Sequence, residues 1–180
     1  MSRFEPLDPA QFTPAQRRVV DQVRAGRRRT VPANVIAWLP SPELARRAAA
    51  LGEFVRYETS LDRRLSELAI LVVARHWSCA YEWAVHAGEA AAAGVPAEVI
   101  DAVGRSATPS LDGPDAAVHD FARELIATGR VADVTHARAV AALGAAGVVD
   151  LVGVVGYYTL VAFTLNAAEV PPPDGSPRLG

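Results

Sequence analysis

The chain has 180 residues, half of them apolar with much alanine and few aromatics, which favours closely packed helices in a single domain over residues 1–180. Its formal net charge of −2 at pH 7 gives no electrostatic basis for binding nucleic acid or an anionic membrane. One cysteine excludes an intramolecular disulfide, and the absence of lysine excludes Schiff-base chemistry at a lysine.

Capping residues, prolines in first turns, glycines at helix ends and helical spacing of apolar residues predict the helices. Residues 1–12 are expected to form a flexible arm, 14–26 a first helix, and 30–40 a connecting segment. Arg27, Arg28 and Arg29 are interpreted as a solvated helix end. Further helices are expected at 42–57, 61–76, 79–93, 96–104, 114–128, 133–143 and 147–169, before a flexible proline-rich tail. The prediction is an all-α bundle of about seven or eight helices with its core between residues 35 and 170.

The run from residue 148 to 165 is apolar enough to suggest a membrane span. Asp150, Tyr157, Tyr158 and two glycines argue against this, and we expect a helix buried in a bundle or a subunit interface. The first twelve residues contain no apolar signal core, so we expect a cytoplasmic protein.

Residues 67–86 are the one stretch in which proton-transferring groups lie within an apolar run. Glu67 interrupts a series of aliphatic side chains, and Cys79, Glu82 and His86 follow at spacings of three and four. On a helix the last three share one face, within an arc of about 60°. Burial raises the pKa of a carboxyl group, and such acids beside a histidine and a thiol indicate an active site.

This site requires a break in the chain after His76. An unbroken helix would separate Glu67 from Cys79 by about 18 Å along the axis and point them about 120° apart. Ser78 is a good N-cap, so we predict that a new helix starts at Cys79. Cys79 would then lie in a first turn, where the helix dipole favours a thiolate.

The spacing of Glu67, Cys79 and His86 matches the motif Glu-x11-Cys-x2-Cys-x3-His of alkylhydroperoxidase-D-like (AhpD-like) proteins, with Glu82 in place of the second cysteine. Tyr81-Glu82-Trp83 and Gly156-Tyr157-Tyr158 are similar to the decarboxylase branch. Over roughly residues 35–170 the chain therefore resembles the carboxymuconolactone decarboxylase / AhpD-like superfamily. The resemblance implies an AhpD-like helical bundle, assembly as trimers or hexamers, and no metal or organic cofactor.

Four residues are catalytic candidates, and each has a structural alternative: Glu67, Cys79, Glu82 and His86. His86 with Glu82 could supply a proton that Glu67 tunes or shuttles. In the structural alternatives, Glu67 forms an ion pair with an arginine such as Arg63, Arg64 or Arg75, and Glu82 merely orients His86. His86 would then be an ordinary polar residue, and Cys79 a small residue of the core.

Four further residues are candidates for substrate binding. Arg75 could bind a carboxylate bidentately, unless it pairs with Glu67, and His76 could lie at the pocket edge. Tyr81 and Trp83 are candidates for the pocket wall or for the core. His119 and His136 are placed on outer helices without a role, and no metal-binding motif is present.

The leading hypothesis is a cofactor-independent lyase that performs acid/base chemistry on a small carboxylated or lactone-like substrate, a class that the resemblance supplies. The first alternative is a Cys79-dependent alkylhydroperoxidase, for which the missing second cysteine would require an external resolving thiol. The second alternative is a non-catalytic oligomeric binding protein.

Overall fold

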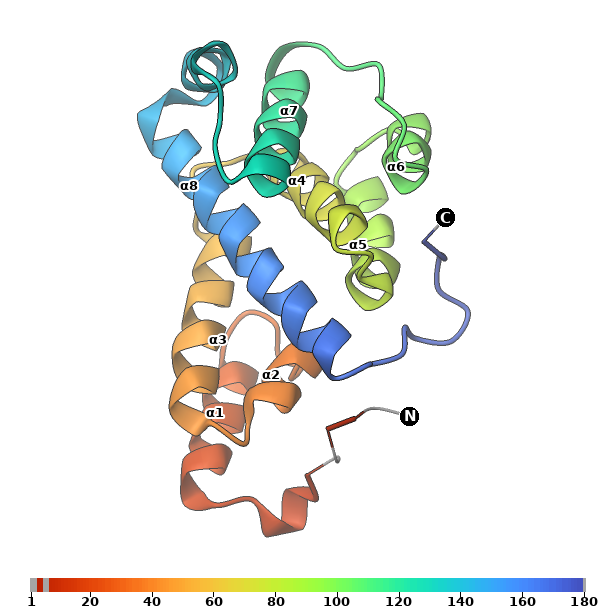
Figure 1. Ribbon diagram of the computed structural model, residues 1–180. Helices are drawn as coiled ribbons and strands as arrows, with labels where there is room; N and C mark the ends of the chain where they lie inside the picture. Colours follow the sequence, from red (N-terminus) through yellow and green to blue (C-terminus); the bar gives the residue numbers. More distant parts are fainter. Residues whose placement is uncertain (1–2, 5–6, 180) are drawn as a thin grey trace.

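The computed structural model describes residues 3–4 and 7–179, and within them helices are the only regular secondary structure (Figure 1). A short 3-10 turn, η1 (Pro9–Gln11), comes before the α-helices. These are α1 (Pro14–Ala25), α2 (Ala33–Trp38), α3 (Pro42–Tyr57), α4 (Arg63–His76), α5 (Ala80–Ala92), α6 (Ala97–Gly104), α7 (Gly113–Thr128) and α8 (Asp133–Ala167). The predicted all-α class is therefore confirmed.

The helix α4 forms the centre of the core. All ten of its residues from Leu65 to Ala74 are buried, and α4 contacts α5, α6, α7 and α8. A helix covered on every side needs apolar residues all around its circumference, which explains the continuous apolar run. Glu67 lies in the middle of this run and is buried with it.

The chain breaks after α4, as predicted, but Ser78 does not cap α5. Ser78 has a φ of +48°, and the amide of Cys79 donates to the carbonyl of Ala74 (2.8 Å), so Ser78 ends α4 in the left-handed conformation usually taken by glycine. The N-cap of α5 is Cys79. The amide of Asn166 in α8 donates to the carbonyl of Trp77 (2.7 Å) and ties the break to the neighbouring helix.

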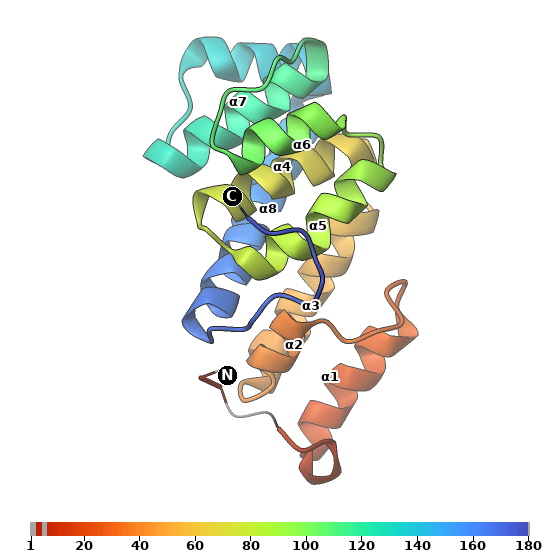
Figure 2. The ribbon, with the colours of Figure 1, turned by 90° about the vertical axis from the view of Figure 1, so that its right-hand side faces the viewer.

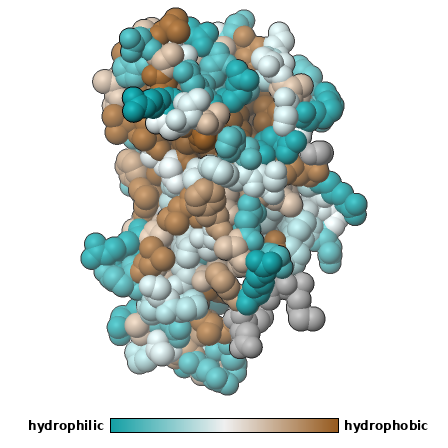
Figure 3. Space-filling model, viewed as in Figure 1, coloured by the Kyte–Doolittle hydropathy of each residue, from teal (hydrophilic) through white to brown (hydrophobic). Residues whose placement is uncertain are grey.

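The last two predicted helices form one element, α8, with a kink at Gly144, whose φ is +72°. By length and composition α8 could cross a membrane, a test that the core helix of a soluble protein also passes. One face of α8, including Leu151, Val154 and Tyr158, is buried in the core. The opposite face exposes apolar side chains, and hydrophobic residues gather over this region in Figure 3. The exposed apolar residues of this face are Val149, Val152, Leu160 and Phe163.

The described N-terminal region contains two short helices that the sequence did not predict, η1 within the expected arm and α2 within the expected connection. Residues 30–40 were expected to be a connection, but they include the short helix α2, which packs against α3 and α8. The helices α1, α2 and α3 lie together in the lower half of Figure 2, whereas α4, α6 and α7 lie in the upper half. The tail, residues 171–179, has no helix, and Leu179 packs against the core.

Candidate functional site

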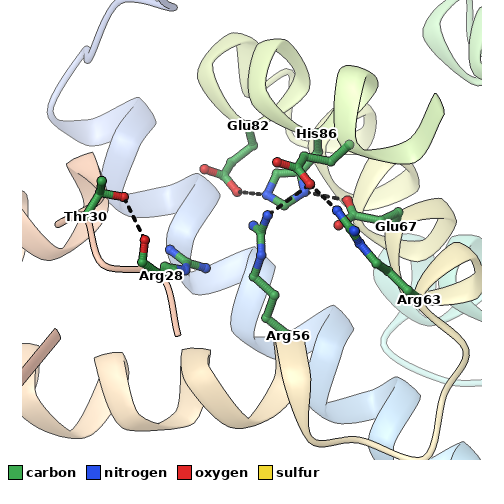
Figure 4. Close-up of polar contacts among 8 residues, drawn as sticks. Arg28, Thr30, Arg56, Arg63, Glu67, Glu82 and His86 are labelled. Atoms are coloured by element: carbon green, nitrogen blue, oxygen red, sulfur yellow. Dashed lines mark hydrogen bonds and ion pairs between the residues drawn. The ribbon is translucent and has the colours of Figure 1, made fainter. Parts of the chain in front are cut away.

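The break between α4 and α5 brings Glu67 and His86 into contact, as predicted. Nδ1 of His86 lies 2.7 Å from Oε2 of Glu67, and Nε2 of His86 lies 3.5 Å from Oε2 of Glu82 (Figure 4). The exposed fractions of Glu67, Glu82 and His86 are only 2%, 6% and 2%. Three proton-carrying groups from two helices therefore form a buried acid–imidazole–acid array.

The alternative that Glu67 pairs with an arginine is wrong. Arg63 contacts Glu89 and Arg64 contacts Asp115. Within the described residues Arg75 has no ion pair with Glu67. The partner of the buried carboxylate is thus an imidazole, the side chain that most often transfers protons in catalysis, and not a guanidinium.

The surroundings of Glu82 favour its protonated form. Burial raises the pKa of this carboxyl group, although His86, Arg28 and Arg56 lower it. Glu67 raises it further, because two carboxylates in one site disfavour a second negative charge. An acid with a raised pKa next to an imidazole is suited to donating a proton.

The array opens on a cavity of about 270 Å³, which Glu82 and His86 line together with Tyr81. The other walls come from distant parts of the chain: Arg28, Thr30, Val31, Pro32, Ala33, Asn34, Arg56, Val85, Tyr157, Tyr158 and Val161. Figure 4 shows Arg28 and Arg56 on the side of the array opposite α5. The cavity thus has a proton-donating wall facing a cationic wall.

Sequence reasoning missed both of these arginines. Arg28 was interpreted as part of a solvated helix end, but it lines the cavity because α2 turns the segment before it back over the site. Arg56 is held near the array by Glu89, with its Nη2 3.4 Å from the carboxylate. Burial lowers the pKa of Arg56, but the surrounding acidic groups, which include Glu67 and Glu89, together outweigh this effect, so its pKa is raised and the guanidinium stays charged.

Two tyrosines of α8 complete the cavity. The ring of Tyr158 stands edge-on to His86 at a centroid distance of 5.1 Å, and burial raises its pKa. Burial also raises the pKa of Tyr157 to about 12, and Nδ2 of Asn34 donates to its hydroxyl (3.4 Å). Both phenols are therefore neutral at neutral pH, and the buried hydroxyl of Tyr158 has no hydrogen-bond partner among the described residues. The Gly156-Tyr157-Tyr158 sequence, which contributed to the family resemblance, was the available signal for them.

Cys79 does not have the properties expected of a reactive thiolate. Its exposed fraction is 0%, and it is not among the residues that line the cavity. Burial raises the pKa of its thiol to about 11, outweighing the backbone amides of Glu82 and Tyr81, which lower it. The expectation that the first turn of α5 favours a thiolate is therefore wrong.

Three of the four predicted substrate-binding residues lie away from this cavity. Arg75 and His76 line a different cavity between α4, α6 and α7. Trp83 is buried against α6, where a Cβ on Gly104 would lie 2.9 Å from its Cζ2. Only Tyr81 lines the cavity beside His86, as expected.

Part of the chain that contains this site is similar to a known protein family. A comparison with curated proteins gives no match. Residues 42–124 match the model of the carboxymuconolactone decarboxylase family, and this segment contains Glu67, Cys79, Glu82 and His86. The match supports the resemblance inferred from the motif: over residues 42–124 the chain is similar to the carboxymuconolactone decarboxylase family.

Proposed function

We propose that the protein is a cofactor-independent lyase that decarboxylates a small carboxylated or lactone-like substrate by acid/base chemistry. The observation that carries the proposal is the buried Glu67–His86–Glu82 array, which faces two arginines across one cavity. The family match supports the general class of chemistry.

Decarboxylation of an enol-lactone acid breaks the bond between carbon and carboxylate and releases CO2. The electron pair moves into the conjugated system and places negative charge on the lactone carbonyl oxygen. Arg28 and Arg56 line the wall of the cavity where they can stabilise this oxyanion. An acid must then protonate carbon, and we assign this role to Glu82, whose pKa is raised by burial.

His86 and Glu67 restore and orient the acid. The contact of Nδ1 with Glu67 fixes the imidazole ring and leaves Nε2 directed at Glu82. After Glu82 has given up its proton, His86 can transfer another to it, and the Glu67 carboxylate stabilises the imidazolium that carries the proton.

The test is turnover of carboxymuconolactone by the purified protein, followed as release of CO2. We expect turnover by the wild type and a loss of at least about 100-fold in kcat for His86→Gln and for Glu82→Gln. Glu98→Gln, which removes an exposed carboxylate from α6, is the matched control and should retain full activity. An inactive wild type, or active His86→Gln and Glu82→Gln variants, would refute the proposal.

We also propose that the protein is a cytoplasmic homo-oligomer, a trimer or hexamer as the family resemblance implies. Support comes from the exposed apolar face of α8, because a second copy of the chain would remove these side chains from water.

A further inference from the structure

A second cavity lies between the C-terminal end of α4, the loop after α6 and the helix α7. Its volume is about 200 Å³, and it shares no lining residue with the cavity beside His86. Arg75 and His76 come from α4, Ser106 and Thr108 from the loop, and His119, Val72, Val103, Ala107, Arg123 and Ile126 complete the lining. These elements lie in the upper half of Figure 2, away from α1 and α2.

Neither arginine of this cavity has an anionic partner among the described residues. Nε of Arg75 is buried without a hydrogen-bond acceptor, and Arg123 forms no ion pair, whereas Arg46 and Arg47 both pair with Glu43. No carboxylate lines the cavity. A buried donor without an acceptor is costly, so the cavity is suited to an oxygen-rich anion from outside the protein.

Asp120 contacts one residue of the cavity lining, His119, and it also forms an ion pair with Arg138. Nδ1 of His119 lies 3.0 Å from Oδ1 of Asp120, and Oδ2 of Asp120 accepts from Nη2 of Arg138 (2.6 Å). The contact with Asp120 fixes the His119 ring and leaves its second nitrogen without a partner in the described part of the chain. His119, which was expected on an outer helix without a role, is buried and lines this cavity.

The cavity also has an apolar side. Val72, Val103 and Ile126 provide aliphatic wall, and Ser106 and Thr108 provide hydroxyl groups. The volume is below the roughly 300 Å³ at which pockets for drug-sized ligands begin, so the ligand has about one ring. A guanidinium presents paired donors that match the two oxygens of a carboxylate.

From this arrangement we propose that the second cavity is a binding site for a small organic carboxylate, held by Arg75, Arg123 and His119 and separate from the acid/base site. The carboxylate lies between the two guanidinium groups, and the apolar body of the ligand contacts the aliphatic wall. The proposal is independent of the reaction proposed for the cavity beside His86.

Benzoate is the probe, and amide chemical shifts of the full-length protein are the readout. We expect benzoate to shift the amides of residues 75–77 and 105–108 with a Kd on the order of 1 mM or tighter. Benzamide, which has the same shape without the charge, should leave them unchanged. Arg28→Gln removes a cation from the other cavity, so these shifts should persist in that variant.

Substitutions of two exposed arginines distinguish binding in this cavity from general electrostatic attraction between benzoate and the protein surface. Arg123→Gln should weaken benzoate binding by about tenfold or more, the loss of one charge-assisted hydrogen bond. Arg105→Gln removes the same charge from the adjacent loop at a residue outside the cavity lining, and it should leave the affinity within about twofold. Arg75→Lys keeps the charge but loses the planar fork, and it should also weaken binding.

Three outcomes would overturn the proposal: benzoate shifts confined to the cavity beside His86, equal responses to benzoate and benzamide, or equal weakening by Arg123→Gln and Arg105→Gln. An affinity that is unchanged in both Arg123→Gln and Arg75→Lys would also overturn it.

Discussion

Glu82→Gln should abolish activity. It should also change the free energy of unfolding, relative to the wild type, more favourably at neutral pH than at acidic pH. Burial raises the pKa of Glu82 in the folded protein above its ordinary value of 4.5. In the wild type, the folded protein favours the protonated form of Glu82, and the resulting contribution to the free energy of unfolding is fully present below the unfolded-state pKa. It is lost as the pH rises through the folded pKa. Glutamine has nearly the same shape and does not ionise, so the variant avoids this loss.

The magnitude follows from the linkage between pKa and folding. Each unit by which burial displaces the pKa of Glu82 changes the difference in unfolding free energy between variant and wild type by about 1.4 kcal/mol. The change develops from about pH 4.5 upward. Glu82 is nearly fully buried, so solvent does not reduce this effect as it would at the surface.

The assay is urea unfolding at pH 5 and pH 8, followed by tryptophan fluorescence, with Glu98→Gln as the control. For Glu82→Gln the difference in unfolding free energy from the wild type should shift in favour of the variant between pH 5 and pH 8, because only the wild type carries the buried carboxyl group whose pKa is raised. For the exposed Glu98 it should not change with pH. A Glu82→Gln variant that is destabilised equally at both pH values would show that the carboxyl group folds in the ionised form and would refute the reasoning.

Three further variants test the packing, the thiol and the assembly. Gly52→Ala would place a Cβ 2.6 Å from Cζ of Tyr157 and closer still to its hydroxyl, so thermal unfolding should show a loss of about 1–3 kcal/mol; Gly88→Ala, with nothing within 4 Å, should be neutral or stabilising, and equal losses would contradict this packing. Cys79→Ala should retain most of the turnover, and the native thiol should react slowly with iodoacetamide at pH 7.5 because its pKa is raised to about 11; rapid labelling would argue for a reactive thiolate. Phe163→Glu should lower the mass measured by light scattering, because it places a charge on the exposed face of α8, and an unchanged mass would exclude this face as the subunit interface.

The sequence was sufficient to predict the fold class, which depends on local signals, and the position of the break, which depends on a geometric requirement. Apolar spacing and capping residues define most of the helices. The break after His76 followed from a geometric requirement, since Glu67 and His86 cannot meet on one straight helix. The conformation of the break was less predictable. Ser78 ends α4 with a positive φ, and tertiary contacts such as the hydrogen bond from Asn166 to Trp77 hold this segment.

The cavity walls could not be predicted in the same way. Arg28 and Tyr157 are 129 positions apart in the sequence, and the packing of α2 and α3 against α8 brings them to one cavity. Arg75 shows the opposite error: eight positions separate it from Glu67, or about 12 Å along α4, and Arg75 lines the second cavity whereas Glu67 contacts His86. Spacing along the chain identifies residues on one helix face, but which cavity a face lines depends on the helices that cover it.

Residues of the candidate site come both from the segment that matches the family and from the segments that flank it. The array of Glu67, Glu82 and His86 lies within the segment that matches the family, and so does Arg56. Arg28, Asn34 and both tyrosines lie outside it, yet they form much of the wall against which a substrate must fit. In the reaction that we propose, the array protonates the atom placed before Glu82, and the flanking segments select the molecule that is placed there. We therefore expect substitutions at Arg28 to change KM and substrate preference, whereas substitutions at His86 lower kcat for every substrate.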